Sequence, residues 1–155
     1  MREIERKFLI SDDSFLAQAI SSKRIAQGYL CSRKVTARVR IYGEQAFITF
    51  KGKSHDGGLS RFEFERAIPM RCAELLLSRC AGVVEKTRHC VRHDNHIWEV
   101  DIFEGENEGL ALAEVELSST DESINLPEWV WKEVTADYHY RNSYLAKVPY
   151  KQWFK

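Results

Sequence analysis

The sequence lacks both a surplus of charge and any long apolar run. Its 23 basic residues balance its 23 acidic residues, which argues against a nucleic-acid-binding surface or a polybasic membrane anchor, because both need excess positive charge. No apolar segment approaches the about 20 residues of a membrane-spanning helix. The N-terminal segment is charged and patterned, unlike a signal peptide. We therefore expect a cytoplasmic protein that binds neither nucleic acid nor membrane.

Closely spaced metal-binding cysteines are also missing. No CxxC pair and no zinc-ligand spacing occurs among the four cysteines, which are Cys31, Cys72, Cys80 and Cys90. We expect all four to be reduced thiols. The sequence has no linker, no repeat of fixed length and no low-complexity tract. Its 155 residues, 44% of them hydrophobic, suit a single domain spanning residues 1–155.

Charged and apolar residues alternate along most of the sequence. The opening segment REIERKFLI places Glu3, Glu5 and Lys7 at every second position, which is the side-chain period of a β-strand. Such windows cover residues 2–10, 35–43, 46–52, 59–68, 83–91, 96–105 and 111–119, and an eighth strand is expected around residues 25–32. Short neighbouring strands joined by tight turns favour an antiparallel sheet or barrel.

Helices are predicted at only four places, which makes the fold class α+β. A short helix is expected over residues 11–20, and a second begins at Pro69 and ends before Gly82. A third begins at Pro127 in the segment PEWVW, and a fourth covers residues 135–148, ahead of Pro149. We expect these helices to pack outside the sheet.

Acidic and basic pairs are segregated by strand. The acidic pairs are 3/5, 63/65, 99/101 and 114/116, and the basic pairs are 38/40 and 86/88. One interpretation is an ordinary sheet whose polar face meets water. The other is a closed sheet whose charged face lines a wet lumen, since burying so many ions in a dry core would cost several kcal/mol per ion.

The second interpretation predicts which ligands the lumen would bind. Arginine forms planar, bidentate contacts with oxyanions, so the basic pairs call for a polyanion with several oxygens, such as a chain of phosphates. No histidine or cysteine accompanies the carboxylate pairs, and oxygen-only ligation indicates Mg²⁺ or Mn²⁺ rather than zinc. Phosphates together with magnesium are typical of phosphoryl-transfer sites.

These motifs resemble those of the CYTH family, the triphosphate tunnel metalloenzymes. The family's ExExK matches residues 3–7, and the later motifs follow in the family's order through about residue 146. They are QGYL at 27–30, RVR at 38–40, TFK at 49–51, RFEFE at 61–65, KTR at 86–88, EVD at 99–101, EVE at 114–116 and EVT at 133–135. The resemblance implies a closed eight-stranded antiparallel β-barrel, a tunnel that binds a triphosphate, and a C-terminal helix near one tunnel mouth.

The resemblance also implies a role for each charged residue. The metal ligands would be Glu3, Glu5, Glu114 and Glu116. The groups that bind phosphate would be Lys7, Tyr29, Arg38, Arg40, Lys51, Lys86 and Arg88. The remaining acids, which would orient the bases or bind a second metal, are Glu63, Glu65, Glu99 and Asp101. The catalytic set would be Glu5, Glu114, Lys51 and Lys86, where a lysine acts as a base only if its pKa falls well below the ordinary value.

The C-terminal segment departs from the family pattern W-L-G-x-E-V-T-x-D-x-R-Y-x-N. Trp131 replaces the glycine, and His139 stands where arginine or lysine is usual. Either the tunnel contact at this position has changed, with Arg141 taking it over, or both changes merely repack a helix.

The expected reaction is hydrolysis of inorganic tripolyphosphate to pyrophosphate and phosphate, with ATP as a weaker substrate. The alternatives are a class IV-type adenylate cyclase, a thiamine triphosphatase, and a non-catalytic module that binds polyphosphate or nucleotides. The segments PEWVW and YKQWF predict either core packing or a homodimer contact.

Overall fold

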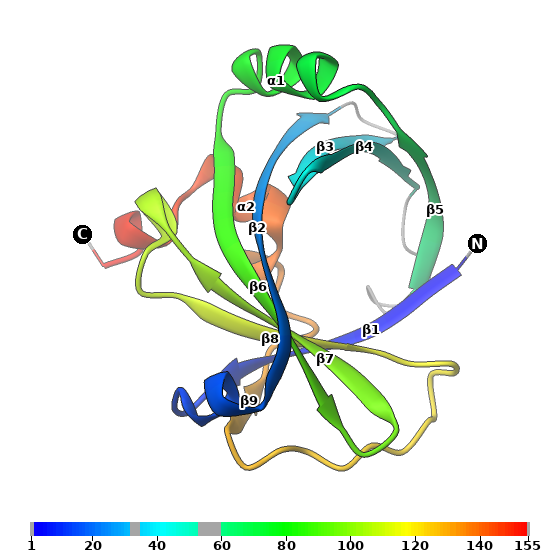
Figure 1. The fold of residues 1–155 in the computed structure, drawn as a ribbon, viewed down its shortest axis with the longest axis vertical. Coiled ribbons are helices and arrows are strands. Elements are labelled where there is room, and N and C mark those ends of the chain that lie inside the picture. Colours follow the sequence, from blue (N-terminus) through cyan, green and yellow to red (C-terminus); the bar gives the residue numbers. More distant parts are fainter. Residues whose placement is uncertain (1, 32–34, 53–59, 155) are drawn as a thin grey trace.

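The chain folds into one antiparallel sheet that curves around on itself. The computed structural model describes residues 2–31, 35–52 and 60–154. Nine strands lie within these residues, in the sheet order β5 (Ser60–Ala67), β4 (Gln45–Lys51), β3 (Thr36–Tyr42), β2 (Ala19–Cys31), β6 (Val83–His93), β7 (His96–Phe103), β8 (Ala111–Glu116), β1 (Arg2–Ile10) and β9 (Val130–Glu133). Figure 1 shows the sheet end-on, with the arc of β2–β5 facing β1, β7 and β8.

Strand β1 pairs with β8 and β9 and, at its N-terminal end, also with β5. Its middle and C-terminal part pairs with β8, from Glu5 opposite Glu116 to Leu9 opposite Leu112. Its N-terminal end pairs with β5 over three residues, in the segments 2–4 and 60–62. The predicted antiparallel sheet with few helices is confirmed. The sheet has nine strands instead of eight, and the predicted closed barrel is not confirmed, because β1 and β5 pair over only three residues.

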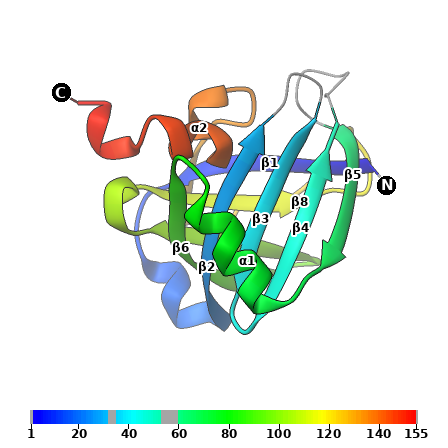
Figure 2. The same ribbon diagram turned by 90° about the horizontal axis from the view of Figure 1, so that it is seen from above.

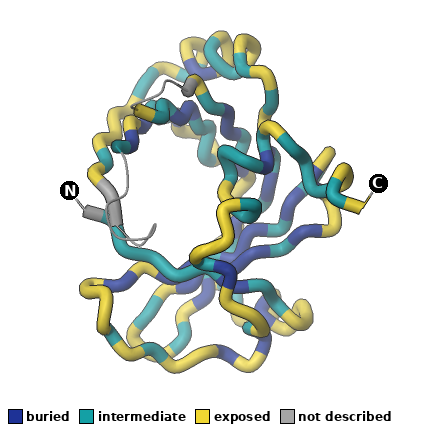
Figure 3. The backbone as a smooth tube through the Cα atoms, turned by 180° about the vertical axis from the view of Figure 1, so that it is seen from behind, coloured by how far each residue is buried: buried dark blue, intermediate teal, exposed yellow. Residues whose placement is uncertain are grey.

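The main core lies on the outer face of β1, β6, β7 and β8. Phe8 packs at 5.5 Å from Trp98, measured between ring centroids, and both side chains are buried. The buried members of this cluster are Phe8, Phe15, Val91, Trp98, Val100, Ala113, Val115, Leu117 and Trp129. They alternate along the strands with charged residues, so the opposite face of the same strands carries the charge. Figure 3 shows how burial is distributed along the backbone.

Two α-helices cover different parts of the sheet (Figure 2). Helix α1 (Met70–Ser78) follows Pro69, as predicted, and packs on the outer face of β3 and β4 through Ala73, Val39 and Ala46. Helix α2 (Asn142–Lys147) contributes Leu145 to a second cluster with Val84, Phe103, Leu110, Leu112 and Val134. Neither of these helices, nor any other in the described part of the chain, is long and apolar enough to cross a membrane.

The prediction of a helix that begins at Pro127 is wrong, because residues Val130–Glu133 form strand β9. Pro127 begins a turn in which its carbonyl accepts a hydrogen bond from the Val130 N–H at 3.1 Å. The turn buries Trp129 against Trp98 at a centroid distance of 5.8 Å. The chain then pairs with β1. Burial of one tryptophan and pairing with a distant strand override the local helix signal.

The two remaining predicted helices are shorter than expected. The first is a 3₁₀-helix over Ser14–Gln18, in which Asp12 Oδ1 accepts from the Ser14 N–H at 2.9 Å. The C-terminal segment divides into a 3₁₀-helix over Tyr138–Tyr140, then α2, and a further 3₁₀-helix over Tyr150–Gln152.

Candidate active site

The strand register brings every predicted charged residue onto one continuous face. Neighbouring strands place Lys7 opposite Glu114, Arg88 opposite Asp101, and Glu99 opposite Glu114. On the other arc, Tyr29 lies opposite Arg38, Arg38 opposite Thr49, and Lys51 opposite Glu63. Directly paired residues project from the same side of a sheet. The structure therefore places the acidic and basic pairs on the inner, concave side of the curved sheet, as the lumen interpretation predicted.

Glu5 and Glu114 form a carboxyl pair at the centre of this face. Repulsion by Glu114, together with burial, raises the pKa of Glu5 to about 8. Burial acts in the same direction on Glu114, but the positive charges of Lys7 and Arg88 outweigh it and hold the pKa of Glu114 well below its ordinary value. Lys7 Nζ lies 3.5 Å from Glu114 Oε1. A half-buried carboxyl in contact with a buried one requires a proton or a cation between them.

A second carboxyl pair lies where β1 meets β5. Burial, followed by a hydrogen bond with Glu63, raises the pKa of Glu3. Lys51 Nζ lies 3.5 Å from Glu3 Oε2 and 3.6 Å from Glu63 Oε2. Lys51 thus lies between two carboxylates that the sequence had placed in different groups.

The arginines of β3 form a strongly positive cluster. Burial, and then repulsion from Arg38 and Arg88, lowers the pKa of Arg40 to about 10. Arg40 Nε donates to Gln27 Oε1 at 3.1 Å, and Arg38 Nη2 donates to the Thr49 hydroxyl at 3.2 Å. The Nε of Arg38 is buried and has no hydrogen-bond partner. A buried, unsatisfied guanidinium donor is typical of a site that is completed by an anion.

Lys86 and Arg88 of β6 share one buried acid. Arg88 makes a bidentate contact with Asp101, through Nε at 2.8 Å and Nη2 at 2.9 Å, and its Nη1 reaches Glu99 Oε2 at 2.8 Å. Lys86 Nζ lies 2.7 Å from Asp101 Oδ2, and the Lys86 side chain is fully buried. Burial lowers the pKa of Lys86 to about 8, which meets the condition that the sequence analysis set for a lysine base.

The predicted four-carboxylate metal site is only partly assembled. Glu5 and Glu114 contact each other, and Glu116 lies directly across from Glu5 in the strand register, with an exposed side chain. Glu3 instead contacts Glu63 and Lys51. Across the described ranges, no group of three or more His, Cys, Asp or Glu side chains is arranged to hold a metal ion.

Three polar residues that the sequence analysis did not assign to the site lie among its charges. Gln27 bridges Arg40 and Tyr29, whose hydroxyl accepts from Gln27 Nε2 at 2.5 Å. Thr49 bridges Arg38 and Glu65, to whose Oε1 it donates at 2.8 Å. Asn142 accepts from Lys86 Nζ at 3.0 Å. Gln27 and Thr49 share the strand period of Tyr29 and Lys51, so their positions were predictable. Asn142 lies on a helix, and no strand pattern indicated its contact with the site.

The two departures from the family pattern lie away from these charges. Trp131 is 67% exposed on β9. The His139 ring stacks on Tyr138 at a centroid distance of 4.1 Å, and its Nδ1 lies 2.6 Å from Asp137 Oδ1. The side chain of Arg141, the residue predicted to take over the contact, is exposed.

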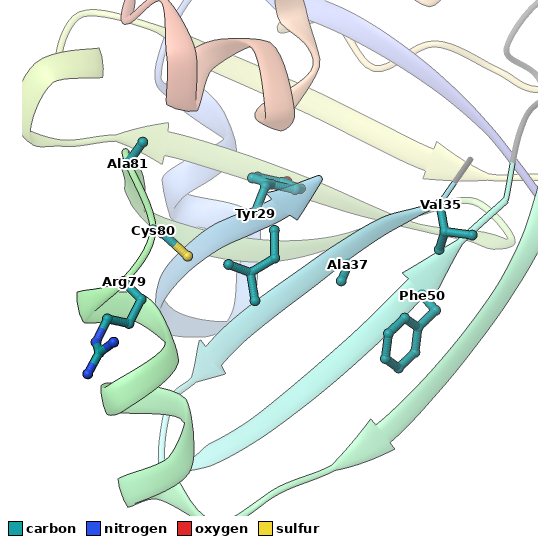
Figure 4. Close-up of a pocket in the computed structure, with 8 residues that line it drawn as sticks. Tyr29, Val35, Ala37, Phe50, Arg79, Cys80 and Ala81 are labelled. Atoms are coloured by element: carbon teal, nitrogen blue, oxygen red, sulfur yellow. The ribbon is translucent and has the colours of Figure 1, made fainter. Parts of the chain in front are cut away.

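A hollow of about 450 Å³ opens beside the end of α1, as Figure 4 shows. Its lining comes mostly from the outer side of the sheet, since Ala37 and Phe50 alternate with the inward-facing Arg38 and Lys51. The residues that line it are Tyr29, Leu30, Val35, Ala37, Phe50, Arg79, Cys80 and Ala81. Only Tyr29 belongs to the charged face, so this hollow is not the candidate active site.

Comparison with known proteins identifies the family. Residues 1–148 match the CYTH domain. The chain belongs to the CYTH family. An inorganic triphosphatase of Acetivibrio thermocellus is 41% identical over 157 residues, which cover 98% of this chain and 97% of that protein. An inorganic triphosphatase of Nitrosomonas europaea is 38% identical, with 94% and 97% covered.

Solved structures share the same CYTH fold. The crystal structure of the inorganic triphosphatase NE1496 aligns with a TM-score of 0.67 at 32% identity, covering 93% of each chain. A Hippeastrum protein described as a putative adenylyl cyclase with dominant triphosphatase activity aligns with a TM-score of 0.60 at 14% identity, covering 76% of this chain and 80% of that chain. At this identity the second likeness concerns the fold alone.

Proposed function

We propose that this CYTH protein hydrolyses inorganic tripolyphosphate to pyrophosphate and phosphate and requires a divalent metal ion. The proposal rests on the arrangement of charged side chains on the inner face of the sheet. Six basic side chains converge there, beside buried carboxyls in mutual contact, and the Nε of Arg38 lacks a partner. A single-phosphate ligand would leave most of these donors unused, whereas a triphosphate presents enough oxygens to engage them. The two inorganic triphosphatases that share 38–41% identity with the chain support the same assignment.

The six cations approach the bound triphosphate from different strands. Arg38 and Arg40 lie on β3, and Lys86 and Arg88 on β6, so they reach the bound triphosphate from the two strands that flank β2. Lys7 and Lys51 reach it from β1 and β4. Their role is to bind phosphate oxygens and to stabilise the charge that develops as the phosphoanhydride bond breaks. Tyr29, which is half-buried, contributes a hydroxyl from the position opposite Arg38.

The carboxyls fit a hard divalent cation such as Mg²⁺ or Mn²⁺. Glu5 and Glu114 supply only oxygen atoms, and their mutual repulsion favours a cation between them. Glu3 and Glu116 lie two residues from them on the same strands and would complete the ligand set. Four further acids form ion pairs with the cations: Glu63 with Lys51, Glu65 with Arg38, Glu99 with Arg88, and Asp101 with Lys86. If a second metal ion binds, these four acids are its proposed ligands. When bound, the metal neutralises phosphate charge and polarises the phosphoryl group.

A base for the attacking water comes from Lys86 or Lys51. Lys86 has the lowered pKa that this role requires, although its ion pair with Asp101 favours the charged form. Both lysines therefore bind phosphate first, and proton transfer is the additional role assigned to one of them.

The test compares three substrates under three metal conditions. The purified chain is incubated with tripolyphosphate, ATP or thiamine triphosphate, in the presence of Mg²⁺, Mn²⁺ or EDTA, and phosphate, pyrophosphate and cyclic AMP are measured. We expect equal amounts of phosphate and pyrophosphate from tripolyphosphate with metal only, and slower turnover of ATP. Tight metal-independent binding without turnover would overturn the proposal in favour of a binding module, and cyclic AMP would identify a cyclase.

A matched pair of variants ties this activity to the inner face. Arg40→Met removes a cation from it, whereas Arg66→Met removes one from the exposed outer side of β5. We expect only Arg40→Met to raise the KM for tripolyphosphate. Closure of the lumen by the contact between β1 and β5, a single domain over 1–155, the cytoplasmic location and the homodimer stay predictions.

A further inference from the structure

Two of the six inner cations are held by the C-terminal segment. Lys7 Nζ donates to the main-chain carbonyl of Tyr140 at 3.1 Å, and Lys86 Nζ donates to Asn142 Oδ1 at 3.0 Å. These acceptors lie two residues apart, although Lys7 and Lys86 come from separate strands. The two residues of the first contact are 133 residues apart in the sequence, and those of the second are 56 apart. Neither contact therefore follows from local chain geometry.

Both acceptors in this C-terminal segment, which we call the tail, are neutral oxygens. An acid such as Asp101 holds Lys86 by cancelling its charge, but an amide oxygen holds an ammonium and leaves its positive charge in place. An ammonium has three N–H donors. With one on Asp101 and one on Asn142, the direction of the third N–H is fixed.

The segment that carries these acceptors is firmly docked. The inner face of the sheet becomes apolar at this end, where Val84, Phe103 and Leu112 follow the strand period of Lys86, Asp101 and Glu114 and pack with Leu145 of α2. Thr135 Oγ1 accepts from the Lys7 N–H at 3.0 Å, and Asn107 Oδ1 accepts from the Tyr150 N–H at 2.8 Å. The tail is therefore anchored on both sides of Asn142.

We propose that Asn142 is a positioning residue that orients the Lys86 ammonium toward the triphosphate. The inference rests on the proposed function for its ligand and deepens it, because it adds a residue outside the strand motifs to the phosphate-binding apparatus. Without the amide oxygen, Lys86 would retain Asp101 as its partner at 2.7 Å, and its ammonium would turn away from the substrate.

The experiment is a double-mutant cycle read by binding in the absence of metal. Affinity for tripolyphosphate is measured by calorimetry in EDTA for the wild type, Asn142→Leu, Lys86→Met and the double variant. Leucine matches the size of asparagine without its acceptor. We expect Asn142→Leu to weaken binding by about 10- to 100-fold, the range for a hydrogen bond to a charged group, and to have almost no further effect once Lys86 is methionine.

Two controls separate positioning from tail packing. In a Lys51→Met background, Asn142→Leu should keep its full effect, because Lys51 contacts Glu3 and Glu63 rather than the tail. Asn107→Leu removes a tail anchor at Tyr150 without removing the acceptor of Lys86. It should lower the melting temperature, and any effect on binding should be the same with Lys86 or methionine at position 86.

A direct probe covers the case in which a double variant fails to fold. In protein labelled with ¹⁵N at the lysine side chains, a held ammonium is protected from solvent exchange, so Asn142→Leu should broaden the Lys86 signal and leave that of Lys51 unchanged. Equal losses in the presence and absence of Lys86, or an unchanged Lys86 signal, would overturn the inference. If the wild type binds tripolyphosphate with the expected coupling but never hydrolyses it, the proposed function fails and the positioning role stands.

Discussion

At the scale of single residues, the contact between Glu5 and Glu114 sets the strongest chemical constraint. Two carboxyls that share a buried position cannot both ionise without a compensating cation. The pKa values of the two carboxyls shift in opposite directions. Lys7 and Arg88 keep Glu114 charged, while the pKa of Glu5 rises to about 8. In the proposed reaction, Glu5 is the group that would exchange its proton for a metal ion.

Replacing Glu5 by glutamine should cost activity far more than stability. Glutamine resembles the protonated form that predominates below pH 8 without metal, so the free energy of unfolding at pH 7 should remain unchanged or rise. Loss of a direct ligand should lower kcat/KM at least as much as the loss of an outer-shell partner, which is about 100-fold. Urea unfolding and phosphate release measure the two quantities. Equal losses in both would point to a structural role.

The protonation of Glu5 also predicts how the stability of the fold depends on pH. The pKa of Glu5 is raised on folding, so its stabilising effect is complete below 4.5 and is lost as pH rises toward about 8. The metal-free wild type should therefore lose stability over that interval, and Glu5→Gln should lose less. Calorimetry at pH 7 in buffers of different ionisation enthalpy should detect a proton released on Mg²⁺ binding by the wild type only.

At the scale of elements, an ion pair between side chains joins strand β9 to β1 in addition to the backbone pairing. Arg6 of β1 makes two contacts with Glu133, at 2.9 and 2.7 Å. The hydrogen bond from Arg6 lowers the pKa of Glu133. Both side chains are partly exposed, so the ion pair contributes at most about 1 kcal/mol.

Glu133→Gln should show the corresponding pH dependence. A lowered folded-state pKa gives stability that is present above the ordinary value of 4.5 and is lost as pH falls through the lowered pKa. The wild type should therefore be the more stable of the two at pH 7, and the difference should shrink toward zero in acid. Thermal unfolding across pH 3–7 measures it, and a difference that does not change with pH would exclude the ion pair as its cause.

The close approach of α2 to the turn before β6 should tolerate no side chain. A Cβ added at Gly82 would lie only 1.9 Å from the Ala146 carbonyl oxygen, so Gly82→Ala should push α2 outward and cost about 1–3 kcal/mol. Gly52→Ala is the matched control, because its Cβ would meet Phe62 at an ordinary 3.6 Å. Urea unfolding of both variants measures the cost, and equal stabilities would show that α2 adjusts without strain.

The elements also show how far the sequence could predict the structure. The alternation of charged and apolar residues correctly indicated seven of the nine strands and the face of the charged candidate residues, because a period of two fixes both at once. The eighth expected strand, around residues 25–32, corresponds to β2. The alternation could not indicate β9, whose four residues are held by the burial of Trp129 and pairing with β1. It also missed Asn142, because a contact between a helix and a strand 56 residues away leaves no local pattern.

At the scale of the whole molecule, a zero net charge conceals strong segregation. Burial, and then repulsion from Arg38 and Arg88, lowers the pKa of Arg40, so the cations of β3 and β6 repel each other. A polyanion that relieves this repulsion binds the folded state only. Tripolyphosphate at 100 times its Kd should stabilise the fold by about 2.7 kcal/mol, measured as a rise in melting temperature without metal. Sulfate at equal ionic strength is the control, and an equal rise with sulfate would mean that charge screening suffices.

The pairing of β1 has a consequence for how this molecule folds. The strand partners of residues 2–10 in the described part of the chain lie in segments 60–62, 112–116 and 130–133, and closing such long loops slows folding. We therefore expect Glu3, Glu5 and Lys7 to join the other charges late, after the hairpins of β3–β4 and β6–β7 have formed locally. Until β1 docks, β5, β8 and β9 each lack a strand partner and expose an edge to neighbouring chains. We expect refolding yield to depend on how quickly β1 docks, and Glu3 and Glu5, two of the proposed metal ligands, belong to this strand.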